Sequence, residues 1–208
     1  MSNILDGREL SGRLYKTLVP RIQSLVSRGI TPCLKIILIG ARQDSIVYTQ
    51  MKAKRCASLG ILCEIVQLPE TIESQEVINR IFSFNSDNLV HGVMVQLPLP
   101  ESIRNDTRKI VDTINVSKDV DGLTSASFGK LITEPIEIND LRNLDFSVSS
   151  TIYGILHFLA DREIDLVGKN VAVVGNSSLI GLPASIILSK LGATVEISQI
   201  YTTNLCER

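Results

Sequence analysis

The sequence predicts an α/β fold in which parallel strands are joined by helices. Apolar residues make up 44% of the 208 residues, whereas aromatic residues make up only 4% and tryptophan is absent. The core must therefore be built from aliphatic side chains, which is typical of a buried parallel sheet. Short apolar runs also alternate along the chain with segments of helical periodicity. That alternation is the pattern of strands connected by helical crossovers.

The first part of the chain is expected to contain three strands separated by helices. Leucine and isoleucine recur at helical spacing between residues 10 and 25, and Asp6 with Glu9 resembles a capping box before them. Gly60 is expected to end the second helix. We predict strands at 34–39, 61–68 and 92–96, and further helices at 44–59, 77–82 and 103–114.

A second unit is expected after a polar connector at 132–149, which lacks a clean period. Helices are predicted at 151–159 and 181–191, and strands at 170–174 and 193–198. The last three elements form one β-α-β unit, which is the opening of a nucleotide-binding fold. We therefore predict two domains, covering residues 1–147 and 148–208.

Charge and cysteine content exclude several classes of function. The formal net charge of −1 provides no excess of positive charge for binding nucleic acid or an acidic membrane. No apolar run approaches the roughly 18 residues of a membrane span, and the N-terminus does not resemble a signal peptide. The four cysteines form no CxxC pair and only two histidines are present, so no metal site is expected. We expect a cytoplasmic protein with buried thiols at Cys33, Cys56, Cys63 and Cys206.

Tyr48 and Lys52 form the first candidate constellation. They are four residues apart, and side chains at that spacing share one face of a helix. The lysine can stabilise developing negative charge or relay a proton, and the ring can stack on a planar ligand. The alternative is an amphipathic helix with a solvated lysine. Short-chain dehydrogenases use the same spacing, but their glycine-rich loop precedes the pair, whereas here Gly175 follows it.

Gln96 is the second candidate, because it is a polar residue at the end of a predicted buried strand. In α/β folds, ligands bind at the carboxyl ends of the strands. Two prolines in the following Leu97-Pro98-Leu99-Pro100 stretch stiffen the loop. The alternative is an ordinary strand end followed by a rigid turn.

The third candidate is the acidic pair Asp119 and Asp121 before Gly122. A carboxylate can accept two N–H bonds from an aminopyrimidine ring. A metal site is less well supported, because other oxygen ligands are not evident. The alternative is an ordinary Asx turn.

The fourth candidate is the glycine turn that links the predicted strand at 170–174 to the following helix. Gly175 begins the turn and Gly181 opens the helix, whose free backbone N–H groups would face a phosphate. The spacing is not GxGxxG, so the turn alone is a weak fingerprint. Its position inside a β-α-β unit strengthens it.

The order and spacing of these motifs carry more information than each motif alone. Ser45, Tyr48 and Lys52 are followed by VQLPLP at 95–100, KDVDG at 118–122 and GxSxxxGxP at 175–183. This series resembles the bifunctional methylenetetrahydrofolate dehydrogenase/cyclohydrolase family, and residues 4–7 and 203–205 also fit. The resemblance covers nearly the whole chain, and VQLPLP together with KDVDG is specific.

The resemblance implies a role for each matching residue. Lys52 is the catalytic lysine, Tyr48 stacks on the folate and holds it over that lysine, and Gln96 hydrogen-bonds the lysine. Asp121 anchors the pterin ring. The implied catalytic residues are thus Lys52, Tyr48 and Gln96, and the substrate-binding residues are Tyr48, Asp121, Leu97 and Pro98. The implied cofactor-binding residues are Gly175, Asn176, Ser177 and Gly181.

The resemblance also implies a fold and a reaction. The fold is an N-terminal three-layer α/β folate-site domain with a parallel sheet, followed by a Rossmann-like nucleotide-binding domain. The reaction is oxidation of 5,10-methylenetetrahydrofolate with NADP or NAD, then hydrolysis of the methenyl product to 10-formyltetrahydrofolate. A folate substrate and a homodimer are expected, without nucleic acid or membrane partners.

The sequence departs from the family pattern at three places. The Pro-Cys-Thr-Pro-like motif keeps only Thr151, and Asn176 replaces an arginine that can meet the NADP 2′-phosphate. The family's later strands and its PGGVGP-type segment are not found in these 208 residues. We therefore expect an incomplete, truncated Rossmann-like domain with weak NAD(P) binding. The alternative function is a non-catalytic remnant that at most binds folate or a partner chain.

Overall fold

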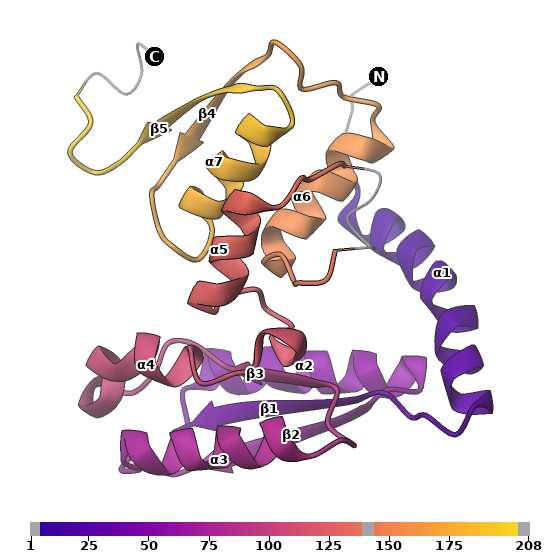
Figure 1. Cartoon of the computed structure of the whole chain (residues 1–208), viewed down its shortest axis with the longest axis vertical. Helices are drawn as coiled ribbons and strands as arrows, with labels where there is room; N and C mark the ends of the chain where they lie inside the picture. The colour runs from indigo at the N-terminus through magenta and orange to yellow at the C-terminus, as the bar shows by residue number, and fades with distance from the viewer. Residues whose placement is uncertain (1–4, 139–143, 204–208) are drawn as a thin grey trace. The chain divides into compact units, whose positions relative to one another are not determined.

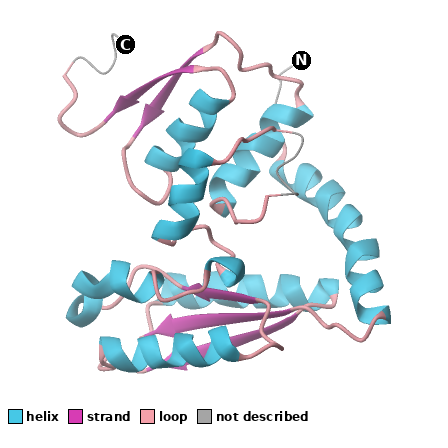
Figure 2. Cartoon of the chain, viewed as in Figure 1, coloured by secondary structure: helices cyan, strands magenta, loops and turns pink. Residues whose placement is uncertain are grey.

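The computed structural model describes residues 5–138 and 144–203 (Figures 1 and 2). The chain forms two compact units, residues 1–120 and 121–208. Of the expected features, Cys206 and most of the 203–205 motif lie outside the described residues. The domain boundary between residues 147 and 148 stays a prediction. In the described part of the chain, no helix has the length and apolar character needed to cross a membrane.

The first unit is built on a three-stranded parallel sheet, as the apolar runs predict. β1 (Cys33–Ile39) lies in the centre, between β2 (Leu62–Leu68) and β3 (Gly92–Val95). Ile36 is aligned with Ile65 on one side and Met94 on the other. Consecutive residues of β1 point to opposite faces, and both Ile36 and Ile37 are fully buried, so the strand is buried on both faces.

Helices cover both faces of this sheet and make the first unit a three-layer structure. α2 (Gln43–Leu59) and α3 (Ser74–Ser86) lie on opposite sides of the strands in Figure 1. Because side chains alternate along a strand, Ile37 and Val95 face α3, whereas Met94 faces α2. α1 (Gly7–Ser27) packs against α2, where the Arg55 guanidinium lies 4.3 Å from the Tyr15 ring centroid.

The predicted helix ends are confirmed where local chemistry determines them. The Asp6 carboxylate accepts hydrogen bonds from the backbone N–H groups of Arg8 and Glu9, so it caps α1. Gly60 ends α2 in the left-handed conformation, with φ of 80°.

The prediction of one continuous helix at 103–114 is wrong. A 3₁₀ helix covers Glu101–Asp106 and the short α4 covers Thr107–Val111. Asp106 leaves the helical conformation, and its carboxylate accepts a hydrogen bond from the Ser74 hydroxyl. Ile103 and Ile110 both reach the core, so the apolar spacing was informative even though the backbone bends between them.

The second unit contains the predicted β-α-β element. β4 (Asn170–Val174) pairs in parallel with β5 (Thr194–Ser198), and α7 (Gly181–Lys190) connects them. A small core of Leu166, Leu188 and Ala193 joins α7 to this sheet. α6 (Ser150–Asp161) matches the helix expected at 151–159.

One helix of the second unit was not predicted. α5 (Ser125–Thr133) begins where the Thr124 hydroxyl accepts a hydrogen bond from the backbone N–H of Ser127. Its sequence contains Gly129 and several serine and threonine residues, which are weak helix formers. The helix is instead stabilised by burial of Leu131, and its last residues fall within the stretch expected to be a connector.

Candidate active site

Tyr48 and Lys52 occupy consecutive turns of α2, as their spacing predicts. Tyr48 is 60% exposed, so its ring is free to contact a ligand, whereas Lys52 is half-buried. Thr49 between them is fully buried, and its hydroxyl donates to the Ser45 carbonyl at 2.9 Å. This buried residue holds the turn against the sheet, while the tyrosine ring points to solvent.

Gln96 follows β3 and faces Lys52, from which it is 44 residues away in sequence. The Lys52 ammonium donates to Gln96 Oε1 at 3.1 Å. The Gln96 amide nitrogen in turn donates to the Leu97 carbonyl at 2.9 Å. The backbone N–H of Gln96 donates to the Ile37 carbonyl at 2.9 Å and so continues the sheet ladder. The lysine is therefore held by an amide whose position is set by the sheet itself.

Met94 is a neighbour of the lysine that the sequence analysis missed. Its sulfur lies 3.6 Å from the Lys52 ammonium, and the side chain is 4% exposed. Residues two apart on a strand share a face. The signal was therefore present, because Met94 and Gln96 have that spacing on the predicted strand.

The loop after Gln96 borders a cavity of about 450 Å³ at the carboxyl end of β1. Leu97 packs against the core, whereas Pro98 is exposed and lines the cavity, and the peptide bond between them is cis. Arg42 and Arg104 contribute positive charge to the lining, and Glu70 and Glu101 contribute negative charge. Of the two loop residues expected to bind substrate, only Pro98 faces this cavity.

The KDVDG segment spans the division between the two units. Asp119 is 2% exposed in the first unit, whereas Asp121 is half-buried in the second. Gly122 has φ of 63°, and a Cβ there would lie 2.3 Å from the Ser147 carbonyl oxygen. Only glycine fits that position, so the backbone after Asp121 requires a glycine for structural reasons.

The glycine turn of the second unit forms the expected link between β4 and α7. A Cβ on Gly181 would lie 2.0 Å from the Gly175 carbonyl oxygen, so the two glycines approach more closely than any side chain permits. The Ser177 hydroxyl accepts a hydrogen bond from the Ile180 N–H at 3.3 Å. The Asn176 amide donates to Gln199 Oε1 at 2.8 Å, across from the end of β5. An exposed turn at a helix N-terminus fits the phosphates of a dinucleotide.

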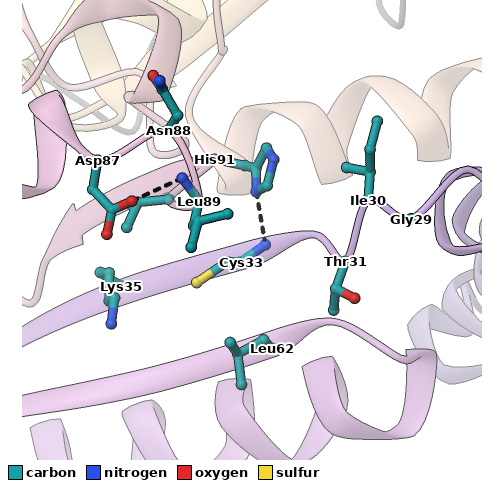
Figure 3. A pocket seen from close by; sticks show the side chains of 11 residues that line it. Gly29, Ile30, Thr31, Cys33, Lys35, Leu62, Asp87, Asn88, Leu89 and His91 are labelled. Atoms are coloured by element: carbon teal, nitrogen blue, oxygen red, sulfur yellow. Dashed lines mark hydrogen bonds between the residues drawn. The ribbon is translucent and has the colours of Figure 1, made fainter.

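A second cavity of the first unit, of about 460 Å³, lies at the opposite, amino-terminal end of the strands (Figure 3). The His91 Nδ1 accepts a hydrogen bond from the Cys33 N–H at 3.2 Å, and the Asp87 carboxylate accepts one from Leu89 N–H at 2.8 Å. Burial raises the pKa of the Cys33 thiol. The His91 and Asp87 side chains thus both accept hydrogen bonds from backbone N–H groups of the protein itself.

Two family models match the chain. The tetrahydrofolate dehydrogenase/cyclohydrolase catalytic domain matches residues 5–121, and the NAD(P)-binding domain of the same family matches residues 149–208. The chain belongs to the tetrahydrofolate dehydrogenase/cyclohydrolase family. Its first unit therefore belongs to the catalytic domain type, and the β4-α7-β5 element belongs to the NAD(P)-binding type.

Individual members of this family are similar along most of the chain. The bifunctional protein FolD of Oceanobacillus iheyensis is 36% identical over 207 residues, which cover 100% of this chain and 69% of the relative. The crystal structure of the bifunctional enzyme FolD from Campylobacter jejuni matches with a TM-score of 0.87 and 36% identity, covering 96% of this chain and 67% of that one. FolD of Trypanosoma brucei, complexed with NADP and an inhibitor, matches with a TM-score of 0.87 and 28% identity, covering 99% of this chain and 67% of that one.

Proposed function

We propose that the chain acts on reduced folates, oxidising 5,10-methylenetetrahydrofolate with NAD(P) and hydrolysing the methenyl product to 10-formyltetrahydrofolate. The observation that carries this proposal is the Lys52–Gln96 hydrogen bond of 3.1 Å in a unit matched by the family's catalytic domain. An exposed tyrosine one turn away on the same helix supplies a flat surface for an aromatic substrate.

Each part of the chain has a distinct task in this proposal. Tyr48 stacks on the folate, and Asp121 accepts hydrogen bonds from the aminopyrimidine part of the pterin. The turn from Gly175 to Gly181 receives the phosphates of NAD(P), which supplies the hydride acceptor when bound. The protein contributes orientation and control of charge around the one-carbon bridge.

Lys52 performs the proton transfers of the hydrolysis step. As a neutral amine it accepts a proton from the water whose oxygen adds to the bridging methenyl carbon. The bond from that carbon to N5 then breaks, and the ammonium returns a proton to N5, which leaves the formyl group on N10. Gln96 holds the lysine in place through its amide oxygen. The remaining hydroxyl proton of the adduct passes to solvent as this bond breaks, so one proton is released overall, which balances the positive charge of the methenyl substrate.

The direct test compares two lysines of the same helix. Lys54 is exposed and lies two residues from Lys52, so Lys54→Met is a matched control for Lys52→Met. Hydrolysis of 5,10-methenyltetrahydrofolate is followed by loss of its ultraviolet absorbance. We expect Lys52→Met to lose activity by at least about a hundredfold, whereas Lys54→Met keeps it. Equal rates for the parent and Lys52→Met would refute the assignment. A parent chain that binds folate without turnover would instead favour the non-catalytic alternative.

Three finer parts of the proposal rest on the family resemblance alone. They are the use of NADP or NAD as the cofactor, a homodimeric state and a cytoplasmic location. Analytical ultracentrifugation of the purified chain tests the second part, since a monomer at micromolar concentration would contradict it.

A further inference from the structure

The ammonium of Lys118 lies at the carboxyl end of α3, more than 30 residues earlier in the chain. It donates hydrogen bonds of 2.9, 2.9 and 2.7 Å to the carbonyl oxygens of Phe84, Asn85 and Asp87. Carbonyls at a helix end generally lack partners within the helix, and the partial negative charge there favours a cation. An ammonium has three N–H donors, and these contacts use all of them.

Asn85 makes the reciprocal connection from α3 to the later segment. Its amide nitrogen donates to the Thr113 carbonyl at 2.7 Å, and its amide oxygen accepts from the Asn115 N–H at 3.0 Å. Asn115 in turn caps the short 3₁₀ helix Val116–Lys118. We call Asn85 and Lys118, with the backbone groups they bind, the α3 clamp. It joins the end of α3 to residues 113–118 from both sides.

The residues after the α3 clamp are fixed along β3. Asp119 forms a parallel bridge with Val93 and is 2% exposed. A Cβ on Gly92 would lie 2.6 Å from Cγ1 of Val120, so the Val120 side chain packs directly against the Gly92 backbone. The chain from Lys118 to Val120 therefore has little freedom, and the next residue is Asp121.

We infer that Lys118 is a positioning residue for folate binding, because it fixes the backbone from which the chain presents the Asp121 carboxylate. This inference rests on the proposed function, in which Asp121 binds the pterin. Lys118 does not take part in the chemistry, since its donors are occupied by protein carbonyls. Without the α3 clamp, the Asp121 carboxylate must be ordered at the moment of binding, which weakens affinity. The Lys52–Gln96 contact does not involve the clamp, so turnover at saturating folate is preserved.

A double-mutant cycle separates positioning from general stabilisation. Affinity of the full 208-residue chain for 5-formyltetrahydrofolate, a stable reduced folate, is measured by calorimetry. The variants are Lys118→Met, Lys118→Arg, Asp121→Ala and the Lys118→Met/Asp121→Ala double variant. Lys109→Met, an exposed lysine on α4, is the control. We expect Lys118→Met to weaken binding about tenfold, with most of the loss restored by Lys118→Arg and none seen in the control. On the Asp121→Ala background, Lys118→Met should change affinity by less than about twofold.

Two results overturn the inference alone. One is a folate affinity that Asp121→Ala weakens but Lys118→Met leaves unchanged. The other is an equally large loss of folate affinity from Lys118→Met on the Asp121→Ala background, which would indicate that Lys118 only stabilises the fold. An unchanged affinity in Asp121→Ala would overturn the pterin contact of the proposed function, and this inference with it. If Lys118→Met fails to fold, Asn85→Ala removes the other half of the clamp and enters the same cycle with the same expected outcome.

Discussion

Gln96 accepts a hydrogen bond from the Lys52 ammonium at 3.1 Å, and its own amide nitrogen donates to the Leu97 carbonyl at 2.9 Å. The bond to the Leu97 carbonyl fixes the orientation of the amide, and so it determines that the oxygen faces Lys52. Turning the amide over would place its NH₂ group against the ammonium and its oxygen against a carbonyl, which is unfavourable at both ends. The loop that follows β3 thus determines which atom meets the lysine.

Replacing the amide with a carboxylate should slow hydrolysis. Gln96→Glu loses the donor to the Leu97 carbonyl. It also places a negative charge beside Lys52, which favours the ammonium form of the lysine, whereas the hydrolysis step needs the neutral amine. We expect a drop of about tenfold or more near neutral pH and a pH–rate profile displaced to higher pH. Gln96→Met, which removes the amide without adding charge, should lower the rate without that displacement. Identical profiles for the parent and Gln96→Glu would contradict the role of the amide.

Asp121 should matter for binding more than for turnover. A carboxylate paired with an aminopyrimidine forms charge-assisted hydrogen bonds worth about 1.5–3 kcal/mol. Asp121→Ala should therefore weaken folate affinity by about one to two orders of magnitude in calorimetry. The exposed Asp112, whose ion pair with Arg108 lies on the surface, provides the control Asp112→Ala. Equal losses in the two variants would argue for a general charge effect.

Gly181→Ala should distort the phosphate turn. The added Cβ would lie 2.0 Å from the Gly175 carbonyl oxygen, which is backbone and must move. We expect faster amide hydrogen exchange in residues 175–182 and no rise in melting temperature on adding NADP. Gly154→Ala is the matched control, because nothing lies within 4 Å of a Cβ on that residue of α6. The control should be neutral or stabilised by about 0.5–1 kcal/mol. Similar exchange rates in both variants would show that the turn tolerates the side chain.

Cofactor preference should respond to residue 176. Asn176 is an uncharged amide bonded to Gln199 at 2.8 Å, so neither side chain offers a positive charge to a 2′-phosphate. Asn176→Arg adds a guanidinium, and we expect the ratio of NADP to NAD affinity to rise about tenfold. Asn176→Gln keeps an uncharged amide and should leave the ratio unchanged. If the ratio of NADP to NAD affinity were unaltered in the arginine variant, the ribose of the nucleotide would not lie beside residue 176.

The thiols should make the folded state sensitive to alkali. Burial raises the pKa of Cys63 to about 11, from a value of 9.0 when unperturbed. The folded state therefore holds this proton more tightly, and the associated stability is present below pH 9 and lost as pH rises toward about 11. Urea unfolding at about pH 8 and pH 10 should show a smaller loss for Cys63→Ala than for the parent. Equal losses would assign the alkaline sensitivity to other groups.

The sequence predicted the strands of both sheets well, because each is a short aliphatic run with a sharp end. The helix at 103–114 was predicted less well, since Ser74 and Asp106 interact across 32 residues and that contact is invisible in a local pattern. α5 was missed because its local propensity is low and its stability comes from packing.

The candidate site was predictable to the extent that it depends on spacing along one element. Tyr48 and Lys52 share a helix, so their relation follows from helical geometry. The contact of Lys52 with Gln96 depends on how α2 crosses β3, which sequence spacing does not reveal. The same holds for Lys118, whose three carbonyl partners lie more than 30 residues away. A lysine that acts as a helix cap at such a distance looks like any solvated lysine in the sequence.

The close approach of Gly92 to Val120 limits how this protein can vary. With Val120 Cγ1 only 2.6 Å from the point where a Cβ would stand, alanine at position 92 requires a smaller residue at position 120. A side chain at position 92 should therefore occur only together with a smaller residue at position 120, among natural variants and in designed libraries. A library that randomises the buried strand β3 one residue at a time would discard position 92 as intolerant. The paired substitution Gly92→Ala with Val120→Ala would recover folded chains that such a screen never samples.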